Sequence, residues 1–223
     1  MGEMVQKNEQ ACDDVRQRCS AMRHLGTGPI SDAMEQLGMP RQVVTGMTFV
    51  SNDPTMAFVG PAYTVRQANK SRAEPHDRDL TRQRQASSQL AQPGDVIVID
   101  VAGRAEYGSW GENQALMAQS RGIVGLVVHG SVRDREWIRQ TGFPVLCRSF
   151  SPVSSKWELE TVAMNEPIAI DGVAIVPGDI IYADADGFIV IPQDQVDTVF
   201  DRALEIHRME EDKRNALYGH GRP

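Results

Sequence analysis

The central part of the sequence alternates short apolar runs with segments whose apolar residues have helical spacing. Three apolar runs, at 95–100, 123–128 and 143–147, are typical of strands that are buried on both faces. The segments between them, 112–121 and 133–140, are expected to form helices. This β-α-β-α-β order predicts a parallel sheet with right-handed crossover connections.

The pattern before this block is less regular. Residues 9–25 are expected to form a helix that glycines end, and Ser31 is expected to cap a second, short helix that runs to Leu37. The region 43–66 is typical of strands broken by Gly and Pro. The polar region 69–90 is expected to be helical only near its end.

After residue 160 the pattern changes to short strands joined by tight turns. Asp171-Gly172, between two apolar segments, predicts a β-hairpin. Asp184–Gly187 predicts a second turn; it resembles the start of a calcium loop but lacks the downstream acidic ligand, so a β-turn is favoured. A C-terminal helix is predicted from about Gln193, with one apolar stripe formed by Val196, Val199, Phe200, Ala203 and Ile206.

Composition narrows the class of protein. With 223 residues, 41% hydrophobic and 24% charged, the chain suits one globular domain. The net charge is −7, and the most basic stretch, 66–84, also contains acidic residues, which argues against nucleic-acid binding. The first residues lack the basic and apolar regions of a signal peptide, no apolar run approaches the roughly 18 residues of a membrane span, and the three cysteines are not expected to form a disulfide framework. We therefore expect a cytoplasmic protein that binds neither nucleic acid nor membrane.

Two predicted loops bring polar residues to the carboxyl edge of the sheet. The loop 101–111 leads into the helix that starts at Glu112, and the segment 129–132 leads to Arg133 and Asp134. Ligands of parallel sheets usually bind at this edge. The helix start and the Arg-Asp pair are therefore expected to face one crevice, with His129 at its border.

These residue types suit a small 2-oxo acid that chelates a divalent cation. Arg133 offers a planar fork for a carboxylate or enolate, and Asp134 is a hard oxygen ligand for Mg²⁺ or Mn²⁺. Glu112 could orient or deprotonate a metal-bound water. The amides of the first helical turn lack intrahelical acceptors and can hold a carboxylate; they belong to Gly111, Glu112, Asn113 and Gln114.

The same residues also have an interpretation without chemistry. An Arg-Asp pair at a helix start is commonly a cap with a surface ion pair, and Glu112 in a first turn suits the helix dipole. The glycines of this region can serve turns and close packing alone. From the residue types and their spacing, both interpretations stay open.

A series of short motifs runs through the chain in a fixed order. The motifs are Ser31–Ala33, Gly60–Ala62, Pro93–Val96, Trp110–Asn113, Arg121–Val128, Gly130–Asp134, Gly142–Val145, Gly172-Val173 with Pro177–Asp179, and Asp184–Gly187 leading into Ile189–Pro192. Together they resemble the RraA-like/HMG-CHA aldolase family over residues 25–210. The resemblance implies a single-domain, layered α/β sandwich of the swivelling β/α type, with 1–24 as an N-terminal helical segment and 211–223 as a polar C-terminal tail.

The resemblance also implies an activity. Family members are class II pyruvate aldolases that cleave 4-hydroxy-4-methyl-2-oxoglutarate or 4-carboxy-4-hydroxy-2-oxoadipate to pyruvate and a second 2-oxo acid. They also decarboxylate oxaloacetate through the same pyruvate enolate. They use a divalent metal, Mg²⁺ or Mn²⁺, and assemble as trimers or hexamers with active sites at subunit boundaries.

The family pattern can be carried over to particular residues here. Catalytic members have an acidic residue, twenty intervening residues and then Arg-Asp, which Glu112, Arg133 and Asp134 match. The acidic position is often Asp, so Glu112 leaves the substrate preference open. By this carry-over, residues 111–114 and Arg133 bind substrate and Asp134 holds the metal. A C-terminal acidic residue, Glu210 or Glu211, would approach the site of the next subunit.

Other functions remain as alternatives. A regulatory branch of the family binds and inhibits a ribonuclease and is expected to lack the complete acidic–Arg–Asp set. Because this chain retains the set, the resemblance favours the enzyme. An enzyme whose natural substrate is oxaloacetate is a further alternative, and a methyltransferase is disfavoured because no Gly-rich nucleotide loop follows the first strand.

Overall fold

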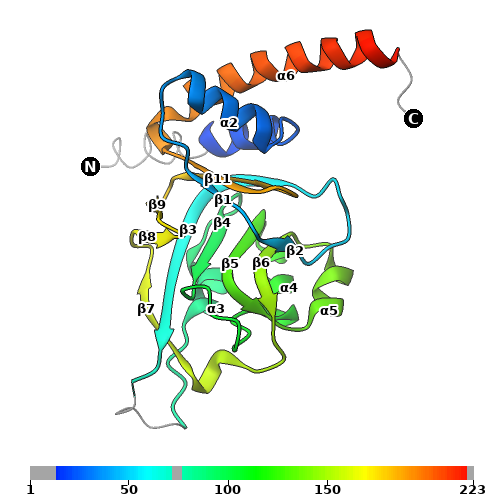
Figure 1. Ribbon diagram of the computed structural model, residues 1–223. Coiled ribbons are helices and arrows are strands. Elements are labelled where there is room, and N and C mark those ends of the chain that lie inside the picture. Colours follow the sequence, from blue (N-terminus) through cyan, green and yellow to red (C-terminus); the bar gives the residue numbers. More distant parts are fainter. Residues whose placement is uncertain (1–13, 72–76, 220–223) are drawn as a thin grey trace.

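A nine-stranded mixed sheet organises the chain, which the computed structural model describes over residues 14–71 and 77–219 (Figure 1). The strand order is β1-β11-β10-β3-β4-β5-β6-β2, and β7 pairs with β3. The strands are β1 (Val43–Val44), β2 (Thr48–Phe49), β3 (Phe58–Asn69), β4 (Val96–Asp100), β5 (Gly125–Val132), β6 (Val145–Phe150), β7 (Leu159–Met164), β10 (Ile180–Asp184) and β11 (Gly187–Ile191). A separate hairpin pairs β8 (Ile168–Ile170) with β9 (Val173–Ile175).

The helices cover two sides of this arrangement. They are α2 (Thr27–Gln36), α3 (Gln83–Gln85), α4 (Glu112–Ser120), α5 (Arg135–Thr141) and α6 (Val196–Tyr218). A π-helical turn at Ala86–Leu90 continues α3, and short 3-10 turns lie at Ser155–Trp157 and Gln193–Gln195. Residues 14–22 are helical, in agreement with part of the helix expected at 9–25, whereas 9–13 lie outside the described residues.

The strands of the central block pair in parallel, as predicted. β3, β4, β5 and β6 are consecutive neighbours, and each of the three pairings is parallel. Their apolar runs are buried on both faces: Ile97 and Ile99 pack in one core and Val96 and Val98 in another. The predicted hairpin at Asp171-Gly172 and the turn between β10 and β11 are also confirmed.

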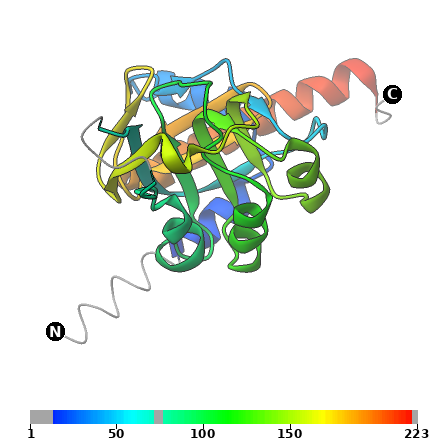
Figure 2. The same cartoon turned by 90° about the horizontal axis from the view of Figure 1, so that it is seen from below.

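Three apolar cores separate the layers. One lies under α4 and α5, against β4, β5 and β6. A second lies between α2 and α6 and the strands β10 and β11, and it includes every residue of the predicted α6 stripe. The third fills the space between β10–β11 and the parallel strands. Figure 1 shows this layered order, with α2 and α6 at the top and α4 and α5 lower down, and Figure 2, seen from below, shows the far end of α6 (red) projecting beyond the rest of the chain. The layered α/β architecture expected from the sequence is therefore present.

The start of α2 differs from the expectation. Ser31 does not cap this helix, which begins four residues earlier, at Thr27. The carboxylate of Asp184, at the end of β10, accepts from Thr27 N at 2.7 Å and from Thr27 Oγ1 at 2.9 Å. The carboxylate of Asp184, although distant in sequence, therefore caps the start of α2.

Two further boundaries differ. Residues 129–132, expected as a loop, continue β5. The tail expected from 211 is helical as far as Tyr218, because α6 continues without interruption past its last buried residue, Ile206. Within the described residues, no helix is long and apolar enough to cross a membrane.

Candidate active site

The start of α4 and the Arg-Asp pair lie side by side, because β4 and β5 are parallel neighbours. Arg133 N donates to the carbonyl oxygen of Trp110 at 2.9 Å, which joins the two connections directly. The amide of Glu112 lies 3.3 Å from Oδ2 of Asp134 and donates to it. The two regions that the sequence places at one crevice are therefore in direct contact.

Asp134 has an unusual backbone conformation. Its φ of 58° and ψ of 37° are left-handed, in a position that directly precedes α5. Such a conformation costs a non-glycine residue about 1–3 kcal/mol, although Asp tolerates it better than most. The side chain does not cap its own helix. Instead it turns toward α4, where Oδ2 also lies 3.5 Å from Nε of Arg133.

Two glycines make this close approach possible. Gly111 has an extended backbone that any residue could adopt, but a Cβ there would lie 2.4 Å from Oδ2 of Asp134. A Cβ at Gly108 would lie 2.9 Å from the carbonyl of Ser151 and 3.0 Å from Cβ of Arg133. Both glycines are therefore required by space and not by conformation.

A cavity of about 180 Å³ opens between these elements. Its charged lining residues are three cations, Arg84, Arg133 and Lys156, and two acids, Asp79 and Asp134. The remaining lining residues are Thr81, Gln83, Gly108, Ser109, Trp110, Gly111, Asn113, Gln114, Ser154 and Ser155. The excess of cationic side chains and the helix start both favour an anionic ligand.

The four first-turn amides are not equivalent. The amide of Glu112 is used by Asp134, and that of Gln114 lies 3.2 Å from the carbonyl of Gly111. The amides of Gly111 and Asn113 have no acceptor in the described part of the chain. These two donors are the ones that remain for a bound carboxylate.

The predicted site residues are only partly gathered in the cavity. Arg133, Asp134, Gly111, Asn113 and Gln114 line it, whereas the side chain of Glu112 does not. Glu112 contributes its backbone amide to the contact with Asp134. Its side chain is partly exposed at the first position of α4.

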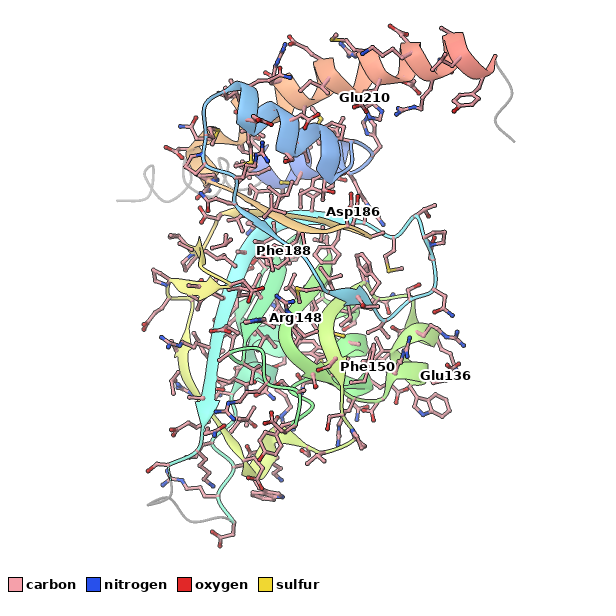
Figure 3. All side chains as sticks on the ribbon, viewed as in Figure 1. Glu136, Arg148, Phe150, Asp186, Phe188 and Glu210 are labelled. Carbon is pink, nitrogen blue, oxygen red and sulfur yellow. The ribbon has the colours of Figure 1, made fainter. Side chains whose placement is uncertain are left out.

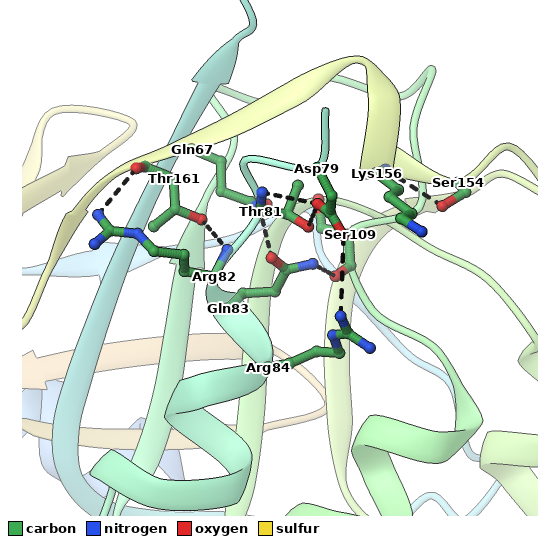
Figure 4. Close-up of polar contacts among 10 residues, drawn as sticks. All are labelled: Gln67, Asp79, Thr81, Arg82, Gln83, Arg84, Ser109, Ser154, Lys156 and Thr161. Carbon is green, nitrogen blue, oxygen red and sulfur yellow. Dashed lines mark hydrogen bonds and ion pairs between the residues drawn. The ribbon is translucent and has the colours of Figure 1, made fainter. Parts of the chain in front are cut away.

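Sequence reasoning missed one wall of the cavity. This wall comes from residues 79–84 and 154–156. Polar contacts form within each segment, and Gln83 and Ser155 each donate to a carbonyl of the loop before α4 (Figure 4). Asp79 accepts from the amide and the hydroxyl of Thr81, a local turn that Asp-x-Thr could have indicated. Nothing in the sequence pattern joins Gln83 or Lys156 to the Arg-Asp pair.

His129 does not line this cavity. Its Nδ1 lies 2.9 Å from Oδ1 of Asp100, its register partner on β4, and its Nε2 lies 3.2 Å from Oδ1 of Asp171. Arg148 on β6 also pairs with Asp171. These four residues fasten the turn of the β8–β9 hairpin to the parallel strands, so His129 has a structural role here.

The possible metal ligand is a single side chain. Within the residues that the structure describes, no group of three or more His, Cys, Asp or Glu side chains could hold a metal ion. The Asp134 side chain is 36% exposed, and it lines the cavity. This arrangement fits a cation such as Mg²⁺, which binds few side chains and keeps several waters.

The other acidic candidates lie away from this cavity. Glu210 is on α6 and forms an ion pair with Arg214 at 3.5 Å. Figure 3 shows Glu210 at the opposite end of the molecule from Glu136 on α5. Within one chain, Glu210 therefore does not reach the Arg-Asp pair.

The fold and cavity define a class of protein: a mixed α/β protein in which a helix start and an Arg-Asp pair line one cavity at the carboxyl edge of parallel strands. A family model described as "RraA-like: Aldolase/RraA" matches residues 27–190. The chain belongs to this RraA-like family.

Relatives and solved structures agree with the family assignment. A protein of Halalkalibacterium halodurans named "Putative 4-hydroxy-4-methyl-2-oxoglutarate aldolase" is 35% identical over 195 residues, covering 87% of this chain and 86% of that protein. "Protein DlpA" of Legionella pneumophila is 33% identical and covers 84% of this chain, but the match spans only 29% of that longer protein. The structure of Streptomyces coelicolor RraAS2, described as an unusual member of the RNase ES inhibitor RraA family, has a TM-score of 0.78 at 28% identity, covering 89% of this chain and 96% of that one.

Proposed function

We propose that this chain is a divalent-metal-dependent carbon–carbon lyase. Its substrates would be 4-hydroxy-4-methyl-2-oxoglutarate or 4-carboxy-4-hydroxy-2-oxoadipate, which it would cleave to pyruvate and a second 2-oxo acid. It would decarboxylate oxaloacetate in the same site. The observation that carries the proposal is the contact between the α4 start and Asp134, in a cavity that Arg133 lines.

The residues of the chain divide the work between binding and charge stabilisation. The free amides of Gly111 and Asn113 would hold the substrate carboxylate at the helix start. Arg133 would lie beside the 2-oxo group and stabilise the negative charge that develops there as the bond breaks. Asp134 would hold Mg²⁺ or Mn²⁺, which when bound polarises the 2-oxo group as a Lewis acid.

Both reactions give the same pyruvate enolate. In the aldol cleavage, the C4 hydroxyl loses its proton, C4 becomes a carbonyl, and the electron pair of the C3–C4 bond passes to C3 as pyruvate enolate. In oxaloacetate, the C3–C4 bond breaks as C4 leaves as CO₂, and its electron pair gives the same enolate. In both reactions the enolate is then protonated at C3 to give pyruvate. Glu112, beside the cavity, is the proposed base that takes the hydroxyl proton through a water.

Pyruvate release tests the proposal. Lactate dehydrogenase and NADH are added to the protein with each candidate substrate, with Mg²⁺ and with EDTA. We expect NADH oxidation that depends on both protein and substrate and that EDTA abolishes. Activity that persists in EDTA would contradict the metal dependence.

A second candidate is a regulator of the ribonuclease-inhibitor type. The description of the Streptomyces coelicolor structure favours it, since that protein has the same fold. The two candidates differ in the pyruvate assay: no pyruvate from any of the substrates would favour the regulator.

We also propose that the chain forms a homotrimer or hexamer in which Glu210 or Glu211 approaches the site of a neighbouring copy. The second half of α6 supports this idea, because it extends away from the cores and exposes Met209, Leu217 and Tyr218 (Figure 1). Light scattering on the assayed preparation measures the mass, and the 24.6 kDa of a monomer would contradict the proposed assembly.

A further inference from the structure

Two buried amide side chains lead from the sheet to the backbone just before α4. Gln83 Nε2 donates to the carbonyl of Ser109 at 3.0 Å, and Gln67 Nε2 donates to Gln83 Oε1 at 3.1 Å (Figure 4). Gln67 is 3% exposed and Gln83 is 4% exposed. Because a carbonyl oxygen can only accept, Ser109 determines which way the amide of Gln83 faces.

Irregular backbone brings both glutamines to this place. The pairing of β3 with β7 shifts register between Arg66 and Gln67, and such bulges re-aim side chains. Gln83 begins α3, which passes into the π-helical turn at Ala86–Leu90, a geometry common at functional sites.

The segment that carries Gln83 is anchored before it reaches the cavity. Arg82 N donates to Oγ1 of Thr161 at 2.8 Å, and Thr161 N donates to the carbonyl of Leu80 at 3.1 Å. Both bonds tie the residues just before Gln83 to β7. The amide of Gln83 is therefore held in place from its own backbone as well as from Gln67.

Gln83 completes a set of contacts on the peptide units before α4. The other contacts there are between backbone groups: Ser109 N donates to the carbonyl of Ser131 at 2.9 Å, and the carbonyl of Trp110 accepts from Arg133 N. Gln83 adds a side-chain donor at Ser109, which lies two residues before Gly111 and its free amide. A change at Gln83 would therefore reach the α4 start through Ser109.

We propose that Gln83 is a positioning residue for the carboxylate-binding start of α4. It acts through Ser109 and keeps the amides of Gly111 and Asn113 directed into the cavity. The identity of the ligand as a 2-oxo acid carboxylate rests on the proposed function, whereas the positioning role rests on the hydrogen bonds above.

A pH profile of Gln83→Glu tests this role. A protonated carboxyl group has the shape of the amide and can donate to Ser109, whereas an ionised one cannot donate and would repel the carbonyl. Burial raises the pKa of such a carboxyl above the ordinary value of about 4.3. We expect the ratio of kcat/KM between variant and wild type to approach one at low pH and to fall as the pH rises between about 5 and 9.

Two matched variants separate positioning from general damage. Gln83→Met cannot donate at any pH, so its kcat/KM should be lower by about 10-fold to 100-fold at every pH. Gln85→Glu introduces the same acid at an exposed position of α3 and should give a flat ratio near one. The other charged groups that line the cavity, Asp79, Arg84, Arg133, Asp134 and Lys156, are present in all of these proteins, so the ratio compares the substituted residue alone.

Binding of oxalate with Mg²⁺, measured by calorimetry, keeps the two proposals distinguishable. If wild type binds oxalate but releases no pyruvate, the proposed function fails while the binding profile of the variants still decides the role of Gln83. If Gln83→Glu does not fold, as judged by circular dichroism, Gln83→Met provides the test. Wild-type values of kcat/KM and oxalate affinity in folded Gln83 variants at every pH would overturn the positioning role.

Discussion

Arg133 is expected to contribute strongly to activity and little to stability. Its side chain is 42% exposed, so it contributes little to packing, yet it lines the cavity beside Asp134. We expect Arg133→Ala to lower kcat about 100-fold or more while changing the free energy of unfolding by no more than about 0.5 kcal/mol. Steady-state pyruvate release and urea unfolding measure the two effects.

The matched control for this variant is Arg139→Ala. Arg139 lies on α5, pairs with Glu136 at 2.8 Å and is similarly exposed, but it does not line the cavity. It should keep wild-type kcat. Arg133→Lys, which keeps the charge but loses the planar fork, should fall between wild type and Arg133→Ala. Equal kcat in Arg133→Ala and wild type would contradict the assigned role.

At the scale of single residues, the sequence could predict the site only where neighbours in the chain cooperate. Arg133 and Asp134 could be expected beside the start of α4 because both segments follow apolar runs that become parallel neighbours, whereas Glu112 contributes only its backbone amide to this contact. Gln83 and Lys156 could not be found in this way. They reach the cavity from segments whose position depends on a bulge, a π-helical turn and the pairing of β7 with β3.

Helices and strands could be predicted where their residues are buried on both faces or at helical spacing. The residues at which they begin and end could not. The apolar run of β4 and the stripe of α6 follow from burial alone. The start of α2 depends on Asp184, which is 157 positions away in the sequence and acts as a cap through tertiary contact. The helix therefore begins at Thr27, where Asp184 accepts from the first amide, and not at Ser31, where a local side-chain cap was expected.

This capping role predicts a stability effect. Asp184→Ala removes the acceptor for Thr27 N and Thr27 Oγ1, so it should lower the free energy of unfolding by about 1–2 kcal/mol. Urea unfolding should show a lower midpoint with an unchanged slope. Asp186→Ala, at an exposed position of the same turn, is the control and should change little. An equal loss of unfolding free energy in both variants would contradict the capping role and would assign the effect to the turn between β10 and β11.

At the scale of the whole molecule, the layers share strands and cannot easily unfold separately. The 12-residue strand β3 pairs with β10 over residues 58–61, with β4 over 62–66 and with β7 over 65–69. Its Val59 packs under α2 and α6, whereas its Val65 packs in the core beneath α4 and α5. The molecule should therefore unfold as one cooperative unit.

Two buried thiols, one in each of two cores, can show whether the molecule unfolds cooperatively. Cys19 packs with α2 and α6, and Cys147 packs in the core beneath α4 and α5. Burial raises the pKa of each thiol to about 12, so neither should react with iodoacetamide at pH 8 in the folded protein. With Cys12→Ser in the background, each thiol can be followed alone in the Cys19→Ser and Cys147→Ser variants.

We expect both thiols to become reactive at the same urea concentration. The pH dependence has a defined sign: an unfolded thiol loses its proton above about pH 8.5 whereas the folded one keeps it to about pH 12. The unfolded state therefore binds fewer protons in this window, and stability falls as the pH rises through it. If Cys19 reacts at a clearly lower urea concentration than Cys147, the layer of α2 and α6 opens on its own, and β3 does not couple the two cores.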